Sequence, residues 1–322
     1  MSNFFGLLQN ENMKIYRRGS FKVMMIILVG LVILVGAIIR FNSTQTNASV
    51  DAQWKQQYRL QVAQDKKQLA ALKASGDTQD YESTKKDMML RQYRLDHNLQ
   101  PPVTETLWSF VMGVADNMIT VIGVLTVIVV ATSIASEFDS GTIKLLLIRP
   151  IYRTEILLSK YVAALVFTLL SLVVLFLTSW LVGGLFFGFD GATEAHLIYA
   201  HGAVHQTSWL LAVWQTYLLG CVSLVMTVTA AGLIAAVFRN GGLAIGLSIF
   251  MMMAGPIVVQ LLAGYDWVKY VLFANTDLTQ YMGGTPLRSE MTLGFSLAVL
   301  AAYYIVFVLV AWAFFTRRDI KA

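Results

Sequence analysis

Long apolar runs separated by short polar stretches dominate the chain. About 20 apolar helical residues cross the roughly 30 Å hydrocarbon core of a bilayer. Six predicted spans reach that length: 21–41, 108–135, 160–187, 209–238, 243–264 and 293–315. The first run is too long for a signal peptide, and no small-residue cleavage site follows it, so we expect it to stay as an anchor. The pattern predicts an all-α, polytopic membrane protein with six transmembrane helices.

The one long polar segment, 42–107, carries apolar residues at helical spacing. The first row is Trp54, Tyr58, Val62, Leu69 and Leu72, and the second, after Ser75-Gly76-Asp77, is Tyr81, Met88 and Leu95. Two rows separated by a glycine-containing turn predict an antiparallel helical hairpin. We expect it between spans one and two on the extracellular side, where it serves either as a solvated stalk or as an arm that recognises a substrate or partner.

The N-terminal segment 1–20 has its own apolar stripe. Phe4, Leu7, Leu8 and Ile15 share one helical face, which Glu11 interrupts, and basic residues follow. This arrangement is typical of an amphipathic helix that lies on the inner face of a membrane. A disordered leader is the alternative.

Lysines and arginines near the span ends indicate the orientation, because short cytoplasmic loops carry more of them. With the N-terminus inside, the inner face holds Lys14, Arg17, Arg18, Lys22, Lys144, Arg149, Arg153, Lys160, Arg239, Arg317, Arg318 and Lys321. The short outer segments hold Arg40, Lys269 and Arg288. Long translocated stretches such as 42–107 largely escape the rule. Both termini are therefore predicted to be cytoplasmic.

The same orientation places the remaining connections. We expect a cytoplasmic loop at 136–159, an extracellular loop at 188–208 and a cytoplasmic turn at 239–242. Residues 265–292 alternate aromatic and polar side chains and predict short helices at, or dipping into, the outer interface. Residues 316–322 form the cytoplasmic tail.

Composition supports the membrane assignment and excludes several functions. The chain is 57% hydrophobic and only 13% charged, whereas soluble domains have about a quarter charged residues. Its net charge of +5 follows from topology, and the absence of repeated basic-aromatic clusters argues against nucleic-acid binding. A single cysteine, Cys221, rules out an intrachain disulfide or a cysteine metal cluster.

Two polar groups near the spans are candidates for chemistry. Asp116 and Asn117 lie inside predicted span two, where an acid usually lines a polar path, unless the span begins after them. Among His196, His201 and His205, the last two are four residues apart, a spacing that suits a metal on one helix face. No HExxH motif accompanies them, and an ordinary exterior loop is the simpler interpretation.

The stretch "ASEFDSGTIKLLLIRPIYRTEILLSKY", residues 135–161, concentrates charge between two spans. Gly141 lets the chain turn, a short helix follows, and Pro150 ends it. Thr154 is a plausible cap for the next helix, which runs into span three. The pattern predicts a short helix that lies across the inner membrane surface, where a soluble partner can bind it.

Read from Glu137 to Lys160, this stretch resembles the signature loop of ABC-2-type permeases, the membrane subunits of ATP-driven exporters with a type V exporter-like fold. The leader at 10–18 is similar to the connecting helix of that family. The likeness extends to six spans, cytoplasmic ends and a large outer insert. The family pattern covers Glu137, Gly141, Thr142, Lys144, Pro150, Arg153 and Lys160.

The resemblance implies that residues 141–148 are a coupling helix that docks on a separate ABC ATPase. It implies two ATPase copies, a second permease (the same chain or a related one), alternating access, and the plasma membrane of a bacterium. The substrate would be hydrophobic or amphipathic: a lipid, peptide or drug. The outer hairpin is longer than in the smallest members, so their substrates do not carry over.

The chain has no GxxxxGK[ST] phosphate loop. We therefore expect no enzymatic activity and no cofactor in this chain, with ATP and magnesium held by the partner ATPase. One alternative is a membrane-embedded sensor or resistance module that transmits force without exporting solute. A second is an ion-coupled carrier, which needs buried ionisable residues in several spans. A third is a membrane enzyme, which needs convergent titratable groups.

Overall fold

The computed structural model describes residues 4–46, 54–75, 78–100, 105–139, 152–189, 195–200, 202–284, 286–288 and 290–317. Its long helices are α2 (Gly19–Thr46), α5 (Leu107–Asp139), α7 (Arg153–Phe187), α8 (Trp209–Phe238), α9 (Gly241–Leu261) and α11 (Leu293–Arg317). All six are long and apolar enough to cross a membrane. This confirms the prediction of a helical, multi-pass membrane protein, with span boundaries close to those expected.

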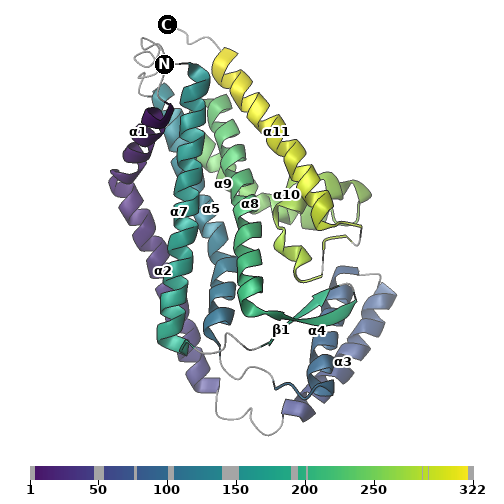
Figure 1. The fold of residues 1–322 in the computed structure, drawn as a ribbon. Coiled ribbons are helices and arrows are strands. Elements are labelled where there is room, and N and C mark those ends of the chain that lie inside the picture. Colours follow the sequence, from purple (N-terminus) through teal and green to yellow (C-terminus); the bar gives the residue numbers. More distant parts are fainter. Residues whose placement is uncertain are drawn as a thin grey trace.

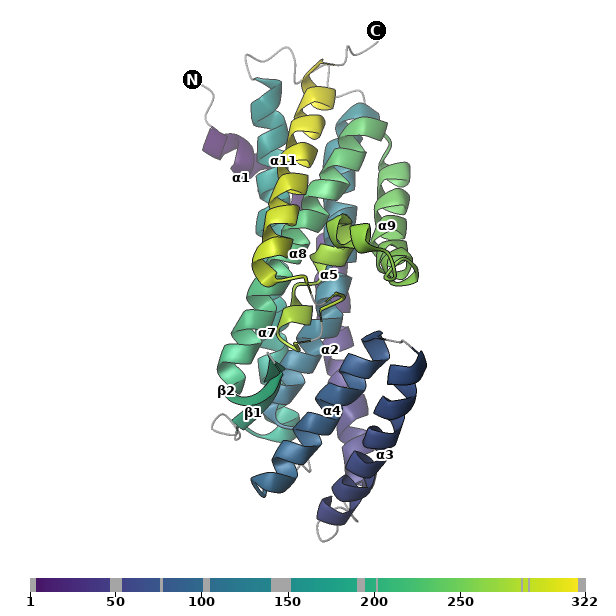
Figure 2. The same cartoon turned by 90° about the vertical axis from the view of Figure 1, so that its right-hand side faces the viewer.

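The bundle is organised around α5, which runs between α7 and α8 (Figures 1 and 2). About 67% of its most apolar stretch is buried, against 17% in α2 and 11% in α11. Phe110 and Ile122 of α5 belong to one core cluster, and Val130 and Ile134 to another. A helix that is apolar on all sides is stable at the centre of a bundle, and α5 has that composition.

Glycines let the neighbouring helices approach α5 closely. A Cβ atom at Gly183 of α7 would lie 2.9 Å from Leu107 Cδ1, and one at Gly220 of α8 would lie 2.5 Å from Ile119 Cδ1. Small residues at such positions are typical of helix packing in membranes, because van der Waals contact is the main attraction there.

Short helices fill the segment between α9 and α11, as the sequence predicts. They are η1 (Asp266–Tyr270), α10 (Leu272–Thr276) and η2 (Thr279–Tyr281). Leu272 packs in one cluster with Met226, from the middle of α8, and with Leu300 of α11. These short helices therefore pack against the side of the bundle and do not stay at the ends of the long helices.

The helical hairpin of α3 (Trp54–Ser75) and α4 (Thr78–Asp96) lies at the end of the molecule opposite both termini (Figure 1). Its register is marked by an ion pair between Arg91 Nη1 and Asp65 Oδ2 at 2.5 Å. Trp54 and Val62, from the predicted first row, are buried. The structure thus has two helices packed together in the segment where the sequence predicts a hairpin.

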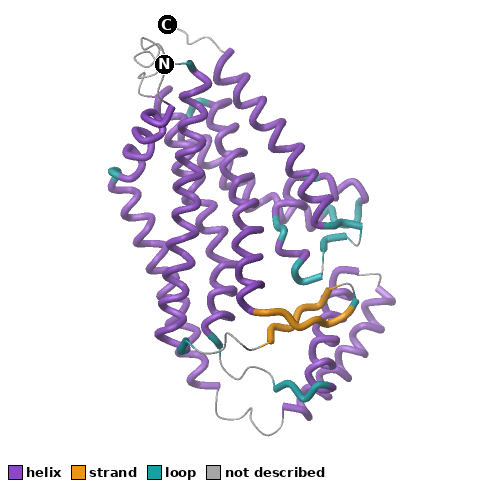
Figure 3. Tube along the Cα trace, viewed as in Figure 1, coloured by secondary structure: helices purple, strands orange, loops and turns teal. Residues whose placement is uncertain are grey.

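Two strands, β1 (Ala195–Ala200) and β2 (Ala203–Ser208), pair antiparallel next to α4 (Figure 3). The sequence predicts an ordinary loop at 188–208, whereas part of it forms this strand pair; the other regular elements among the described residues are helices. Ala200 pairs with Ala203, so the connection is tight. Gly202 has a φ of 81°, which a residue without a Cβ adopts readily and which such short hairpin turns require.

Candidate functional site

The residues predicted to form the coupling loop are only partly described. Gly141, Thr142, Lys144 and Pro150 lie outside the described residues. Glu137 belongs to the last turn of α5, and its side chain is likewise outside the description. Arg153 and Lys160 are described, and both lie in the first turns of α7. We call residues 153–160 the α7 entry segment.

Lys160 forms a nearly dry ion pair with the N-terminal helix α1 (Phe4–Tyr16). Its Nζ atom lies 2.8 Å from Glu11 Oε2, and the two side chains are only 2% and 9% exposed. The other carboxylate oxygen of Glu11 accepts from Lys14 Nζ, also at 2.8 Å. A buried ammonium is tolerated when a carboxylate compensates it. Glu11, which interrupts the apolar stripe of the leader, is therefore the counter-ion of Lys160.

Apolar contacts hold α1 against α7 around this ion pair. Ile15 is buried in a cluster with Ala163 and Phe167 of α7. The Tyr16 and Phe21 rings meet edge to face at 4.9 Å, and Phe21 meets Phe167 at 6.1 Å. One face of the predicted amphipathic helix is thus covered by protein, and burial raises the pKa of Tyr16 above its usual value.

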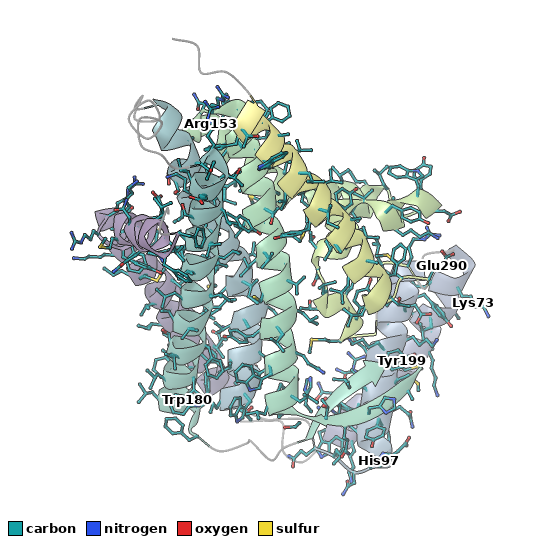
Figure 4. All side chains as sticks on the ribbon, turned by 45° about the horizontal axis from the view of Figure 1, so that its top comes forward. Lys73, His97, Arg153, Trp180, Tyr199 and Glu290 are labelled. Carbon is teal, nitrogen blue, oxygen red and sulfur yellow. The ribbon has the colours of Figure 1, made fainter. Side chains whose placement is uncertain are left out.

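The same entry segment bonds to the C-terminal end of α11. Arg153 Nη1 donates to the Thr316 carbonyl at 3.2 Å, and Trp312 Nε1 donates to Thr154 Oγ1 at 3.2 Å. Thr154 is therefore not the helix cap that the sequence predicts: α7 already begins at Arg153, with Tyr152 at the cap position. Figure 4 shows Arg153 at the end of α7 that lies near the end of α11.

The α7 entry segment is a junction of three helices. It follows directly on the predicted coupling loop and contacts α1 through Lys160 and α11 through Arg153 and Thr154. From Arg153 to Lys160 the helix rises about 10 Å. Within two turns, α7 is therefore bonded to two other helices.

Asp116 and Asn117, the candidate pathway residues, both lie on the exposed side of α5. The Asn117 amide donates to the Gly113 carbonyl at 2.9 Å. Asp116 is close enough to Asp277, just after α10, for the two carboxylates to interact. Within the described part of the chain, the structure thus brings Asp116 near Asp277 on the exposed side of α5.

The histidines do not form a metal centre within the described part of the chain. No three histidine, cysteine, aspartate or glutamate side chains there are grouped to hold a metal, and His201 lies outside the described residues. His196 of β1 packs on Trp209, with ring centroids 4.0 Å apart. Burial, and then Arg94 and Lys86 of α4, lower the pKa of His196. Its environment favours neutral imidazole packed in an interface.

Sequence reasoning missed the partners of the two described coupling residues. Glu11 is 149 residues from Lys160, and Thr316 is 163 from Arg153. One signal in the sequence was Glu11 itself, an acidic residue within an apolar stripe. If another helix covers that stripe, the buried carboxylate needs a positive counter-charge. Nothing in the pattern pointed to the Trp312–Thr154 bond.

Comparisons with known proteins agree with the membrane architecture. The family described as "Protein of unknown function (DUF2705)" matches residues 85–321. "Uncharacterized protein YhcI" of Bacillus subtilis (strain 168) is 42% identical over 319 residues, 98% of each chain. "Uncharacterized membrane protein YdbK" of the same organism is 33% identical over 201 residues, which cover 61% of this chain and 77% of that protein.

Proposed function

The chain belongs to the DUF2705 family, and we propose that it is the permease subunit of an ATP-binding-cassette exporter. In this proposal it lies in the plasma membrane of a bacterium with both termini in the cytoplasm. The α3–α4 hairpin then lies outside the cell, and α1 lies at the inner membrane surface. The exported substrate is hydrophobic or amphipathic.

The observation that carries the proposal is the junction at the α7 entry segment. A permease without its own nucleotide site needs an element that receives motion from a partner and passes it into the bundle. Residues 153–160 meet that need, because they follow the loop that resembles a coupling helix and are bonded to α1 and α11.

In this proposal ATP is bound by a separate subunit and not by this chain. The 322 residues contain no GxxxxGK[ST] motif, the loop that cradles nucleotide phosphates. ATP and magnesium would be bound by a separate ATPase, in two copies for two permeases. The exposed face of α5 that carries Asp116 and Asn117 suits a second permease, because a carboxylate in a span is costly when it faces lipid.

Co-expression with an ABC ATPase encoded next to the gene tests this proposal. We expect Lys144→Glu and Gly141→Pro to weaken co-purification or uncouple hydrolysis from transport. Loss of a charge-assisted contact costs about 2–5 kcal/mol if buried and little at a rim. Glu137→Gln should keep assembly and lower transport, because it lies where α5 ends.

Lys67→Glu, a matched charge reversal on the exposed side of α3 at the other end of the molecule, is the control and should change nothing. If all three loop variants co-purify with the ATPase and transport at wild-type rates, the proposal is wrong. Vanadate-sensitive ATP hydrolysis by the purified chain alone would also contradict it.

A second candidate function is a membrane-embedded sensor that uses the same fold without moving solute. The observation that favours it is the attachment of the α3–α4 hairpin to a span. Gln206 Nε2 of β2 approaches Tyr93 Oη of α4 at 3.4 Å, and β2 continues directly into α8. Replacing residues 50–98 by a short linker distinguishes the two. If the protein is a sensor, the deletion variant loses its response to the external signal but still binds the ATPase. The intact chain then responds to the signal without transporting a solute.

A further inference from the structure

An apolar cavity of about 150 Å³ lies within one copy of the chain, lined mainly by side chains of α8, α9 and α10. Its lining includes Met226, Ser248, Met251, Met252, Phe273 and Phe307. Cavities of about this size with apolar walls stay dry and take up small apolar molecules such as benzene. The size and walls therefore suit a ring or a short hydrocarbon end.

Ser248 supplies a polar group at the wall. It is 6% exposed, and its Oγ atom has no hydrogen-bond partner among the described residues. The other two hydroxyls of the wall are satisfied by their own helices: Thr227 donates to the Ser223 carbonyl at 3.1 Å, and Thr276 donates to the Phe273 carbonyl at 3.2 Å. Leaving a buried hydroxyl unpaired costs free energy, and a ligand with one hydrogen-bond acceptor would remove that cost.

The walls are built to adapt to an occupant. Three methionines, Met226, Met251 and Met252, line the cavity, and their flexible, polarisable thioethers fill irregular space. Phe273, on the five-residue helix α10, packs against Gly255 of α9, where an added Cβ would collide with its ring. The glycine thus allows the aromatic wall to sit close to α9.

We propose that this cavity binds a small apolar group that carries one hydrogen-bond acceptor, such as a carbonyl, with Ser248 Oγ as the donor. The group could belong to a bilayer lipid or to a free solute, and the chemistry of recognition is the same for both. The site lies within a single chain and needs no ATPase, so it does not rest on the export proposal.

Two probes of similar size, ten and nine heavy atoms, test the hydroxyl and the cavity separately. 4-Fluoroacetophenone carries a carbonyl, and 4-fluoroethylbenzene does not. Fluorine NMR of each probe with the purified chain in detergent should show saturable binding of both, and tighter binding of the ketone. Ser248→Ala should weaken the ketone on the order of 3- to 10-fold and leave the hydrocarbon within about twofold.

Ala230→Leu adds volume at the cavity wall and should abolish binding of both probes. Ser171→Ala is the matched control: it removes a buried serine of α7 whose hydroxyl already donates to the Phe167 carbonyl, and both affinities should stay unchanged. Because Ser248→Ala removes an unpaired hydroxyl, the Tm of this variant should equal or exceed that of the wild type. The Ser248→Ala measurement therefore remains informative even if Ala230→Leu fails to fold.

Native mass spectrometry distinguishes the two sources of the ligand. A phospholipid that co-purifies with the wild type but not with Ser248→Ala indicates bilayer lipid. Probe binding without co-purified lipid indicates a free solute. The proposal is overturned if neither probe binds the wild type saturably, or if the ketone binds wild type and Ser248→Ala equally.

Discussion

Lys160 and Glu11 show how one pair of side chains connects distant parts of this protein. Their ion pair is almost entirely removed from water, with the two side chains 2% and 9% exposed. Taking two charges out of water is expensive, and the pair is held because each charge compensates the other. The N-terminal helix is therefore tied to α7 by a contact that fails if either charge is lost.

We expect Glu11→Gln to destabilise the protein by about 3–5 kcal/mol, because it removes the carboxylate charge that lies 2.8 Å from the buried Lys160 ammonium. Replacing both partners by apolar residues, Glu11→Leu with Lys160→Met, should be close to neutral. Thermal unfolding of the purified variants, together with the rate of tryptic cleavage near Arg17 and Arg18, measures the effect.

Lys14→Met is the matched control for this pair. Lys14 contacts the same carboxylate but is 42% exposed, and exposed ion pairs contribute about 0–1 kcal/mol. If Lys14→Met costs as much as Glu11→Gln, then the burial of Lys160 is not the source of the stability.

At the scale of elements, the outer hairpin is a docked structure. Tyr93 of α4 stacks on His97 at 3.9 Å and approaches Gln206 of β2. Figure 4 shows His97 and Tyr199 at this junction. Most described residues of α4 are partly buried, because the helix packs on α3 at one side and on the strands at the other.

This docking should weaken in acid. The pKa of His196 is lowered by burial and by Arg94 and Lys86, so the undocked state binds a proton more readily than the docked one. Docked stability is therefore complete above the ordinary histidine pKa of about 6.5 and falls as the pH drops through that value. The protection factors of described amides in the two strands, that is, their exchange rates corrected for the intrinsic slowing of exchange in acid, should fall as the pH drops from about 7.5 to about 5.

His196→Gln should remove this pH dependence, whereas His205→Gln, on the exposed side of β2, should retain it. An equal acid response in both variants would show that another group controls the docking.

At the scale of the whole molecule, helix length relates the bundle to the membrane. The 35 residues of α7 rise about 50 Å, well beyond a hydrocarbon core of about 30 Å. Both termini lie at one end of the bundle, and the α3–α4 hairpin lies at the other (Figure 1). The two ends therefore belong on opposite sides of the membrane.

Cysteine labelling tests which end faces the cytoplasm. In a Cys221→Ser background, Gln57→Cys on the exposed side of α3 should react with an impermeant maleimide on intact cells. Phe5→Cys in α1, 77% exposed, should react only after the membrane is permeabilised. The reverse pattern would invert the proposed topology, and labelling of Cys221→Ser alone gives the background.

The sequence by itself determined the six spans and the two rows of the outer hairpin. A bilayer requires about 20 apolar residues per span and backbone hydrogen bonds satisfied within each helix, so local hydropathy is sufficient. Resemblance also selected Lys160 and Arg153. What they contact could not be read from local patterns, since their partners Glu11 and Thr316 are far away in the chain.

Only the tertiary structure decided the features that depend on how the helices pack against one another, such as the cavity at Ser248 and the support of the β-hairpin. Ser248 is an ordinary serine in an apolar run until α8 and α10 close around it and leave its hydroxyl unpaired. The β-hairpin at 195–208 likewise gains its support from α4. Helix formation in a membrane is a local matter of hydrogen bonding and hydropathy, whereas pairing depends on shape and charge across the assembled bundle.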